Sequence, residues 1–169
     1  MSIQIVWQHE TFGRQIEHRV PVLNAELVLT RIGDVIIDAS WQTAIDRNIC
    51  DESTFVKQVR AYLMDPRRCL LEVQLLERGT AYSQKIWQAL LNIPFGDVIS
   101  YSALADKLGS GPRAVAQACK NNPYAGIIPC HRVVSKNGIG GFMGQSQGEM
   151  IELKRQLLAY ERSMFEFVK

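Results

Sequence analysis

Residues 101–120 read YSALADKLGSGPRAVAQACK, and this stretch decides the fold of the second half of the chain. Residues 102–108 have the pattern of a short helix that Gly109 ends, and 112–119 form another, because proline suits the first helical position. Asn122-Pro123 then stops the second helix. Two short helices joined by a turn with glycine at the bend are typical of a helix-turn-helix, which many proteins use to bind DNA. A packed helical hairpin without a ligand has the same spacing.

Amphipathic helices are predicted on both sides of this unit. Apolar residues recur at helical spacing over about 82–91, where a proline follows and ends the pattern. A last helix is predicted over about 149–161. Its polar face carries Lys154, Arg155 and Glu161. The second half is therefore expected to be mostly helical.

The first half has a different pattern. Short apolar stretches alternate with polar ones over residues 1–42, and glycines separate them, which predicts a small antiparallel sheet. An amphipathic helix follows from Ser53 to Asp65-Pro66, where proline ends it. Residues 67–80 are interpreted as a connector. The expected organisation is an α+β protein with domains at 1–80 and 81–169.

Composition excludes several classes of protein. The chain has 169 residues, of which 47% are hydrophobic and 21% charged, so a fibrous or mainly disordered protein is excluded. The sequence has neither a signal peptide nor an apolar run of about 18 residues that could span a membrane, so we expect a cytoplasmic protein. Net charge is −2 over residues 1–80 and +4 over 81–169, which favours a polyanion partner for the second half.

The cysteines form no pair of the CxxC kind, which predicts free thiols in a reducing compartment. The histidines of the first half, His9 and His18, lie far from its cysteines in sequence, so we expect no metal. The four cysteines are Cys50, Cys69, Cys119 and Cys130.

Cys130 is the best candidate nucleophile. It lies between Pro129 and the two basic residues His131 and Arg132. An unperturbed thiol is only a few per cent ionised at pH 7, and nearby positive charge or a partner base increases that fraction. A buried structural Cys-His pair has the same sequence, and neighbouring side chains diverge in an extended chain, so a turn or a bridging water would be needed.

The sequence PCHRV at 129–133 resembles the active-site signature of the O6-alkylguanine-DNA alkyltransferases, also called methylated-DNA-protein-cysteine methyltransferases. The resemblance covers about residues 82–161, and its core is highly specific. It implies a small RNase H-like domain over 1–80, followed by a mostly helical domain of winged helix-turn-helix type. The other motifs that carry it are Gly96-Asp97-Val98-Ile99-Ser100-Tyr101, Arg113-Ala114-Val115, Asn122-Pro123, Gly138, Gly141-Phe142 and Leu157-Leu158-Ala159-Tyr160-Glu161.

The resemblance implies a chemistry without any cofactor. Cys130 would take the alkyl group from O6 of guanine, or O4 of thymine, in one irreversible displacement that leaves the protein alkylated. His131 would act through a water as the base, and Glu161 would orient His131. Asn122 would be a hinge between the recognition helix and the active-site strand.

The resemblance also implies the partner, a double-stranded DNA with an alkylated guanine, bound by a monomer through the minor groove. The damaged nucleotide would be flipped out, Arg113 would enter the stack, and Tyr101 would rotate the 3′ phosphate. The remaining expected DNA contacts are Ala114, Ala116 and Arg132. The expected pocket residues are Tyr101, Ile128, Pro129, Val133, Phe142 and Met143.

The chain departs from the family pattern at the pocket. Phe142 stands where many members have tyrosine, and Met143 stands where some have a serine. Gln145-Ser146-Gln147-Gly148 resembles an insertion before the last helix. Three other functions stay open at this point: a non-catalytic sensor of alkylated bases, a helix-turn-helix regulator with an unrelated thiol, and a cysteine hydrolase. Cys130 argues against the sensor, whose relatives replace this cysteine, and we find no oxyanion-hole signature for the hydrolase.

Overall fold

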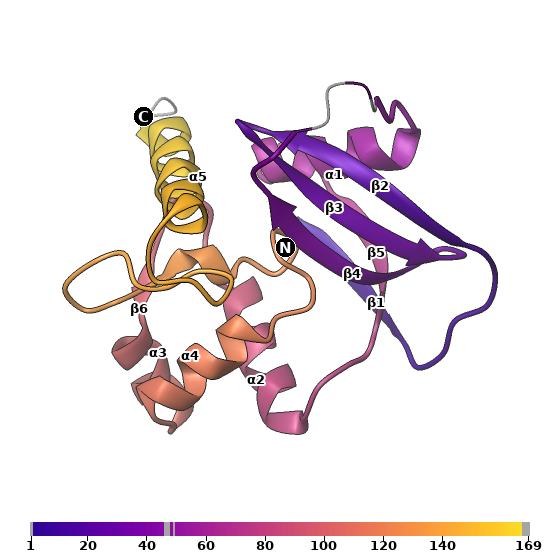
Figure 1. Cartoon of the computed structure of the whole chain (residues 1–169). Helices are drawn as coiled ribbons and strands as arrows, with labels where there is room; N and C mark the ends of the chain where they lie inside the picture. The colour runs from indigo at the N-terminus through magenta and orange to yellow at the C-terminus, as the bar shows by residue number, and fades with distance from the viewer. Residues whose placement is uncertain (1, 46–47, 49, 167–169) are drawn as a thin grey trace. The chain divides into compact units, whose positions relative to one another are not determined.

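The computed structural model describes residues 2–45, 48 and 50–166. Its chain divides into two compact units, which are described separately (Figure 1). The first unit contains the residues up to Arg78 together with Pro123–Ile127, and the second contains Gly79–Asn122 and the residues from Ile128 onward. The sequence predicted a single domain over residues 81–169, whereas Pro123–Ile127 belongs to the first unit.

The first unit contains a five-stranded mixed sheet in the order β1-β5-β4-β3-β2. Strands β2, β3 and β4 are antiparallel, as predicted, but β1 and β4 both run parallel to β5. The interpretation of 67–80 as a connector was wrong, because Leu71, Val73 and Leu75 are the buried positions of β5. The strands are β1 (Ile3–Gln8), β2 (Gln15–Val22), β3 (Ala25–Ile32), β4 (Val35–Gln42) and β5 (Leu71–Leu76).

One helix, α1 (Thr54–Met64), packs against this sheet. Ser53 caps its first turn by accepting a hydrogen bond from the Val56 amide, and the helix ends at Asp65, before proline, as predicted. Buried Val56 and Val59 face the sheet, which closes the core of this unit.

Pro123–Ile127 joins the first unit through backbone hydrogen bonds. The Ala39 amide donates to the Pro123 carbonyl at 2.8 Å, and the Ala125 amide donates to the Ala39 carbonyl at 3.1 Å. The Tyr124 side chain is fully buried, and its hydroxyl donates to the Leu76 carbonyl. These contacts explain the difference from the predicted domain boundary, since sequence periodicity does not reveal pairing between segments this far apart.

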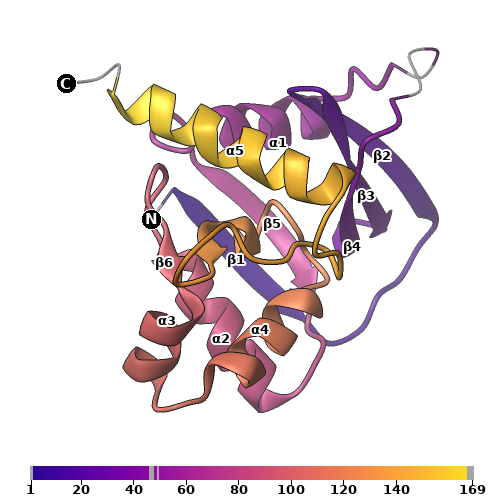
Figure 2. The same cartoon turned by 60° about the vertical axis from the view of Figure 1, so that its left-hand side comes forward.

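The second unit is mostly helical, as predicted. Gly109, whose φ of 63° is left-handed, ends α3, and Pro112 begins α4, so the expected helix-turn-helix forms (Figure 2). The Trp87 indole donates to the Ala118 carbonyl at 2.8 Å and holds α2 to α4. Among the described helices, none combines the length and the hydrophobicity that a membrane-spanning segment requires. The elements are α2 (Ala81–Leu91), β6 (Ile99–Ser100), α3 (Tyr101–Leu108), α4 (Pro112–Lys120), the 3-10 helix η1 (Cys130–Arg132), β7 (Val133–Val134) and α5 (Glu149–Glu166).

Candidate active site

The segment that carries Cys130 is a tight turn. The Cys130 amide donates to the Ile128 carbonyl at 2.8 Å and the Arg132 amide donates to the Pro129 carbonyl at 3.1 Å. Residues Cys130–Arg132 thus form a single 3-10 turn in front of β7, and all three side chains are buried. The backbone at Cys130 and His131 is therefore turned and not extended.

His131 forms a buried pair with the last helix. Its Nε2 lies 2.9 Å from Oε1 of Glu161, and both side chains are almost fully buried. An ionised carboxylate can only accept, so Nε2 carries the proton and Nδ1 of a neutral ring keeps its lone pair. Among the described residues Nδ1 has no hydrogen-bond partner, although it is buried. This nitrogen is therefore an available base inside the protein.

Arg132 completes the same network and is not a surface residue. Its guanidinium donates to both Glu161 oxygens, with the shortest distance 2.8 Å, and to the Ile93 carbonyl at 3.0 Å. Arg132 was predicted to contact DNA, whereas in this structure its guanidinium is buried and pairs with Glu161 inside the protein. Burial raises the pKa of Glu161, but His131 and Arg132 outweigh it and lower that pKa to about 2. Glu161 is thus a permanent anion at neutral pH.

Two polar side chains, Asn122 and Lys154, interact with the Cys130 thiol. Asn122 donates from Nδ2 to the Ile128 carbonyl at 2.9 Å, and its side chain also hydrogen-bonds to Cys130. Burial raises the pKa of the Cys130 thiol, whereas Asn122 and the ammonium of Lys154 oppose that rise. The resting group is then a thiol whose ionised form has partners ready to stabilise it.

Lys154 is the residue that the sequence analysis missed. It was assigned to the polar face of the last helix, but it is fully buried and donates to the Val133 carbonyl at 2.7 Å and to the Gly141 carbonyl at 2.9 Å. Glu161 was assigned to the same face and is buried as well. A signal was available, because Lys154 and Glu161 follow Ile151 and Leu157 at the three- and four-residue spacing of the buried stripe.

A hollow of about 580 Å³ opens beside the thiol. Arg113 and Ala116 of the predicted DNA contacts line it, while Ala114 lies on the exposed surface of α4. Ile128, Pro129 and Val133 are buried and are not among the described residues that line this hollow, so their place in the pocket stays a prediction. The lining residues are Tyr101, Arg113, Ala116, Gln117, Cys119, Lys120, Cys130, Ser135, Gly141, Phe142, Met143, Gly144, Gln145 and Ser146.

Known proteins are similar in sequence to most of this chain. Residues 81–163 match the family described as "6-O-methylguanine DNA methyltransferase, DNA binding domain". A probable methylated-DNA-protein-cysteine methyltransferase of Acanthamoeba polyphaga mimivirus is 37% identical over 130 residues, which are 71% of this chain and 87% of that protein. The chain belongs to the methylated-DNA-protein-cysteine methyltransferase family.

Other members of the methyltransferase family agree in sequence and in fold. A methylated-DNA-protein-cysteine methyltransferase of Metallosphaera sedula is 32% identical over 143 residues, 83% of this chain and 88% of that protein. The crystal structure of Mycobacterium tuberculosis O6-methylguanine methyltransferase has a TM-score of 0.67 at 30% identity and covers 89% of this chain and 94% of its own. M. tuberculosis OGT in complex with DNA gives a TM-score of 0.65 at 34% identity, over 86% and 91% of the two chains. The predicted family and α+β fold class are confirmed.

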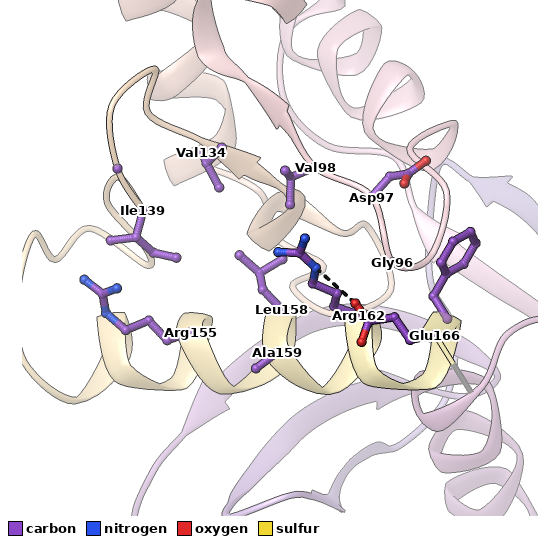
Figure 3. A pocket seen from close by; sticks show the side chains of 12 residues that line it. Gly96, Asp97, Val98, Val134, Ile139, Arg155, Leu158, Ala159, Arg162 and Glu166 are labelled. Atoms are coloured by element: carbon purple, nitrogen blue, oxygen red, sulfur yellow. Dashed lines mark ion pairs between the residues drawn. The ribbon is translucent and has the colours of Figure 1, made fainter. Parts of the chain in front are cut away.

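A second hollow, of about 760 Å³, lies along α5 in this methyltransferase-family chain (Figure 3). Arg155 and Arg162 point into it from the helix, and Arg162 pairs with Glu166 at 3.7 Å. The described residues that line it include no cysteine and no histidine. The first hollow, by contrast, is lined by Cys119 and Cys130.

Proposed function

We propose that this chain repairs DNA by transferring an alkyl group from O6 of guanine, or O4 of thymine, to Cys130. The observation that carries the proposal is the buried thiol beside a hollow, with the His131–Glu161 pair in the same unit. Sγ forms a bond to the alkyl carbon while the bond from that carbon to O6 breaks, and the base leaves with the electron pair. No step restores the thiol, so each chain acts once.

The thiol must lose its proton for this displacement. Burial keeps it protonated at rest, and the free lone pair on Nδ1 of His131 supports a base that acts through a water. The resulting imidazolium would be stabilised by Glu161, which is already ionised. Asn122 and Lys154 would stabilise the thiolate that forms. The proposed roles are nucleophile for Cys130, base for His131 and orienting anion for Glu161.

The target base has to leave the duplex to reach a buried sulfur, which costs a few kcal/mol of unstacking and unpairing. Arg113 is exposed at the start of α4 and lines the mouth of the hollow, so it is the candidate to fill the gap in the stack. Ala114, beside it, allows close approach to the minor groove. Tyr101 begins α3 at the same hollow and would meet the 3′ phosphate.

The proposed division of labour assigns the lesion to the second domain, 81–169, and support to the first, 1–80. All residues named in the mechanism, Cys130, His131, Glu161, Asn122 and Lys154, belong to the second unit, which supports that division.

Intact-protein mass spectrometry tests the transfer. After incubation with a duplex that contains one O6-methylguanine, the protein is expected to gain about 14 Da, and peptide mapping should locate the gain at Cys130. Cys130→Ala is the control and should gain nothing. Tight, lesion-selective binding without a mass gain would move the chain to the sensor class, and repeated turnover of one chain would contradict the single-use mechanism.

The salt dependence of DNA binding tests the interface. α4 exposes Arg113 and Lys120, and the second half has a net charge of only +4. If two to four phosphates are neutralised, the plot of log K against log salt should have a slope of roughly −2 to −4. The measurement is a titration of the same methylated duplex between low and physiological salt. A slope near about −8 would mean a far larger phosphate contact than this surface offers.

A further inference from the structure

Met143 lies in a backbone conformation that its side chain does not favour. Phe142 and Gln145 exchange two backbone hydrogen bonds, each 2.9 Å long, so Met143 and Gly144 form a two-residue turn. Their φ angles are 50° and 78°, both left-handed. Such a turn is normally built from asparagine and glycine, because longer side chains are strained there. Methionine at the first position is therefore not what the turn itself requires.

Leu23 is the matching case in the same chain. It has a φ of 54° in the two-residue turn between β2 and β3. Leu23 and Met143 are the two non-glycine residues of the described chain that have a positive φ. Leu23 belongs to the first unit and is not among the residues that line the hollow. It carries a comparable backbone strain without any relation to the site, which makes it a matched control.

The turn at 142–145 is held firmly at the mouth of the hollow. Gly141, just before it, accepts hydrogen bonds from Lys154 at 2.9 Å and from the Tyr101 hydroxyl at 3.4 Å. A Cβ on Gly144 would lie 3.4 Å from Cε of Lys120, so the turn also lies against α4. These contacts fix the position of Met143 in the lining of the hollow.

Met143 lines the hollow at a different depth from Cys130. The thiol is almost fully buried and Phe142 is 5% exposed, whereas Met143 is half-buried. A single carbon on the Cys130 sulfur stays within the buried part of the lining, to which Cys130 and Phe142 belong. A longer alkyl group extends toward the mouth, where a flexible and polarisable thioether can pack against it.

We propose that Met143 is a specificity-determining residue that favours apolar alkyl groups larger than methyl. This inference rests on the proposed function and names its substrate class, guanines with a bulky apolar group at O6. Contact with each additional carbon in an apolar pocket changes selectivity by about 10-fold or more. The backbone strain at Met143 is then retained because asparagine or glycine, which suit the turn better, would lose that contact.

Single-turnover rates on two duplexes test the proposal, one with O6-methylguanine and one with O6-benzylguanine. Met143→Asn is expected to lower the benzyl-to-methyl rate ratio about 10-fold. Leu23→Asn, the control, should leave the ratio as in the original chain. Met143→Leu keeps the apolar volume and should retain most of the ratio, whereas Met143→Gly should lower it as asparagine does.

Thermal unfolding accompanies each rate. The asparagine variants at 143 and 23 should both unfold at the same or a higher temperature, because asparagine tolerates the left-handed region. A ratio that is unchanged or higher in Met143→Asn and Met143→Gly would overturn the inference while the proposed function stands. If the original chain accepted neither the methyl nor the benzyl group, the proposed function itself would be contradicted.

Discussion

Replacing Glu161 with glutamine should weaken the fold by about 3 kcal/mol at pH 7 and slow alkyl transfer at least about 100-fold. Arg132 would remain buried with no anion to balance it, and removing one partner of a buried ion pair is strongly destabilising. His131 would also lose the carboxylate at 2.9 Å that holds its ring. Urea unfolding and single-turnover rates measure the two effects separately.

The pKa of Glu161 determines how the stability of the fold changes with pH. The pKa of Glu161 lies near 2 in the folded chain, against 4.5 for an ordinary glutamate. A lowered pKa contributes stability that is fully present above about pH 4.5 and is lost as pH falls toward 2. The original chain should therefore lose about 3 kcal/mol of this stability over that window, and the glutamine variant should not.

Glu166→Gln is the matched control, because Glu166 pairs with Arg162 on the exposed surface of the same helix. Exposed pairs contribute at most about 1 kcal/mol, so this variant should unfold and react like the original chain. If Glu161→Gln and Glu166→Gln had equal effects, the buried network would have no special role.

Local periodicity predicted the helices well. Ser53, Gly109 and Pro112 each act at the helix end or start that their chemistry predicted, because capping depends on residues a few positions away. β5 was missed for the opposite reason. Leu71, Val73 and Leu75 alternate like any short strand, and only their parallel neighbours, far away in sequence, distinguish a central strand from a connector.

The residues of the site that belong to a sequence motif could be predicted. The roles of those that depend on a buried partner were harder to predict. Cys130 was a candidate nucleophile from its neighbours in the sequence, whereas the roles of His131 and Glu161 came from the resemblance. The structure brings His131 and Glu161 together. The role of Arg132 was harder to predict, because an arginine beside a nucleophile is compatible with either a phosphate contact or a buried pair. The three-dimensional partner, Glu161, decides between them, and it lies 29 residues away.

Replacing Lys154 with methionine should raise the apparent pKa that governs transfer and slow transfer at pH 7 roughly 10- to 100-fold. Methionine has a similar length and suits a buried position, so the main change is the loss of the ammonium beside Cys130. The hydrogen bonds to Val133 and Gly141 are lost as well, which would reduce stability. Rates measured from pH 6 to pH 10 separate the two effects.

Burial lowers the pKa of Lys154 to about 8 despite the opposing influence of the two nearby thiols, Cys130 and Cys119, so its charge disappears as pH rises through that value. An electrostatic role therefore predicts that the difference between the original chain and Lys154→Met shrinks above about pH 8. A purely structural role predicts an equal slowing at every pH, since packing does not titrate. Arg155→Met removes a charge from the next position, on the hollow along α5, and should leave the profile where it was. A profile that moves equally in both variants would mean that general surface charge, and not Lys154 at the thiol, promotes its ionisation.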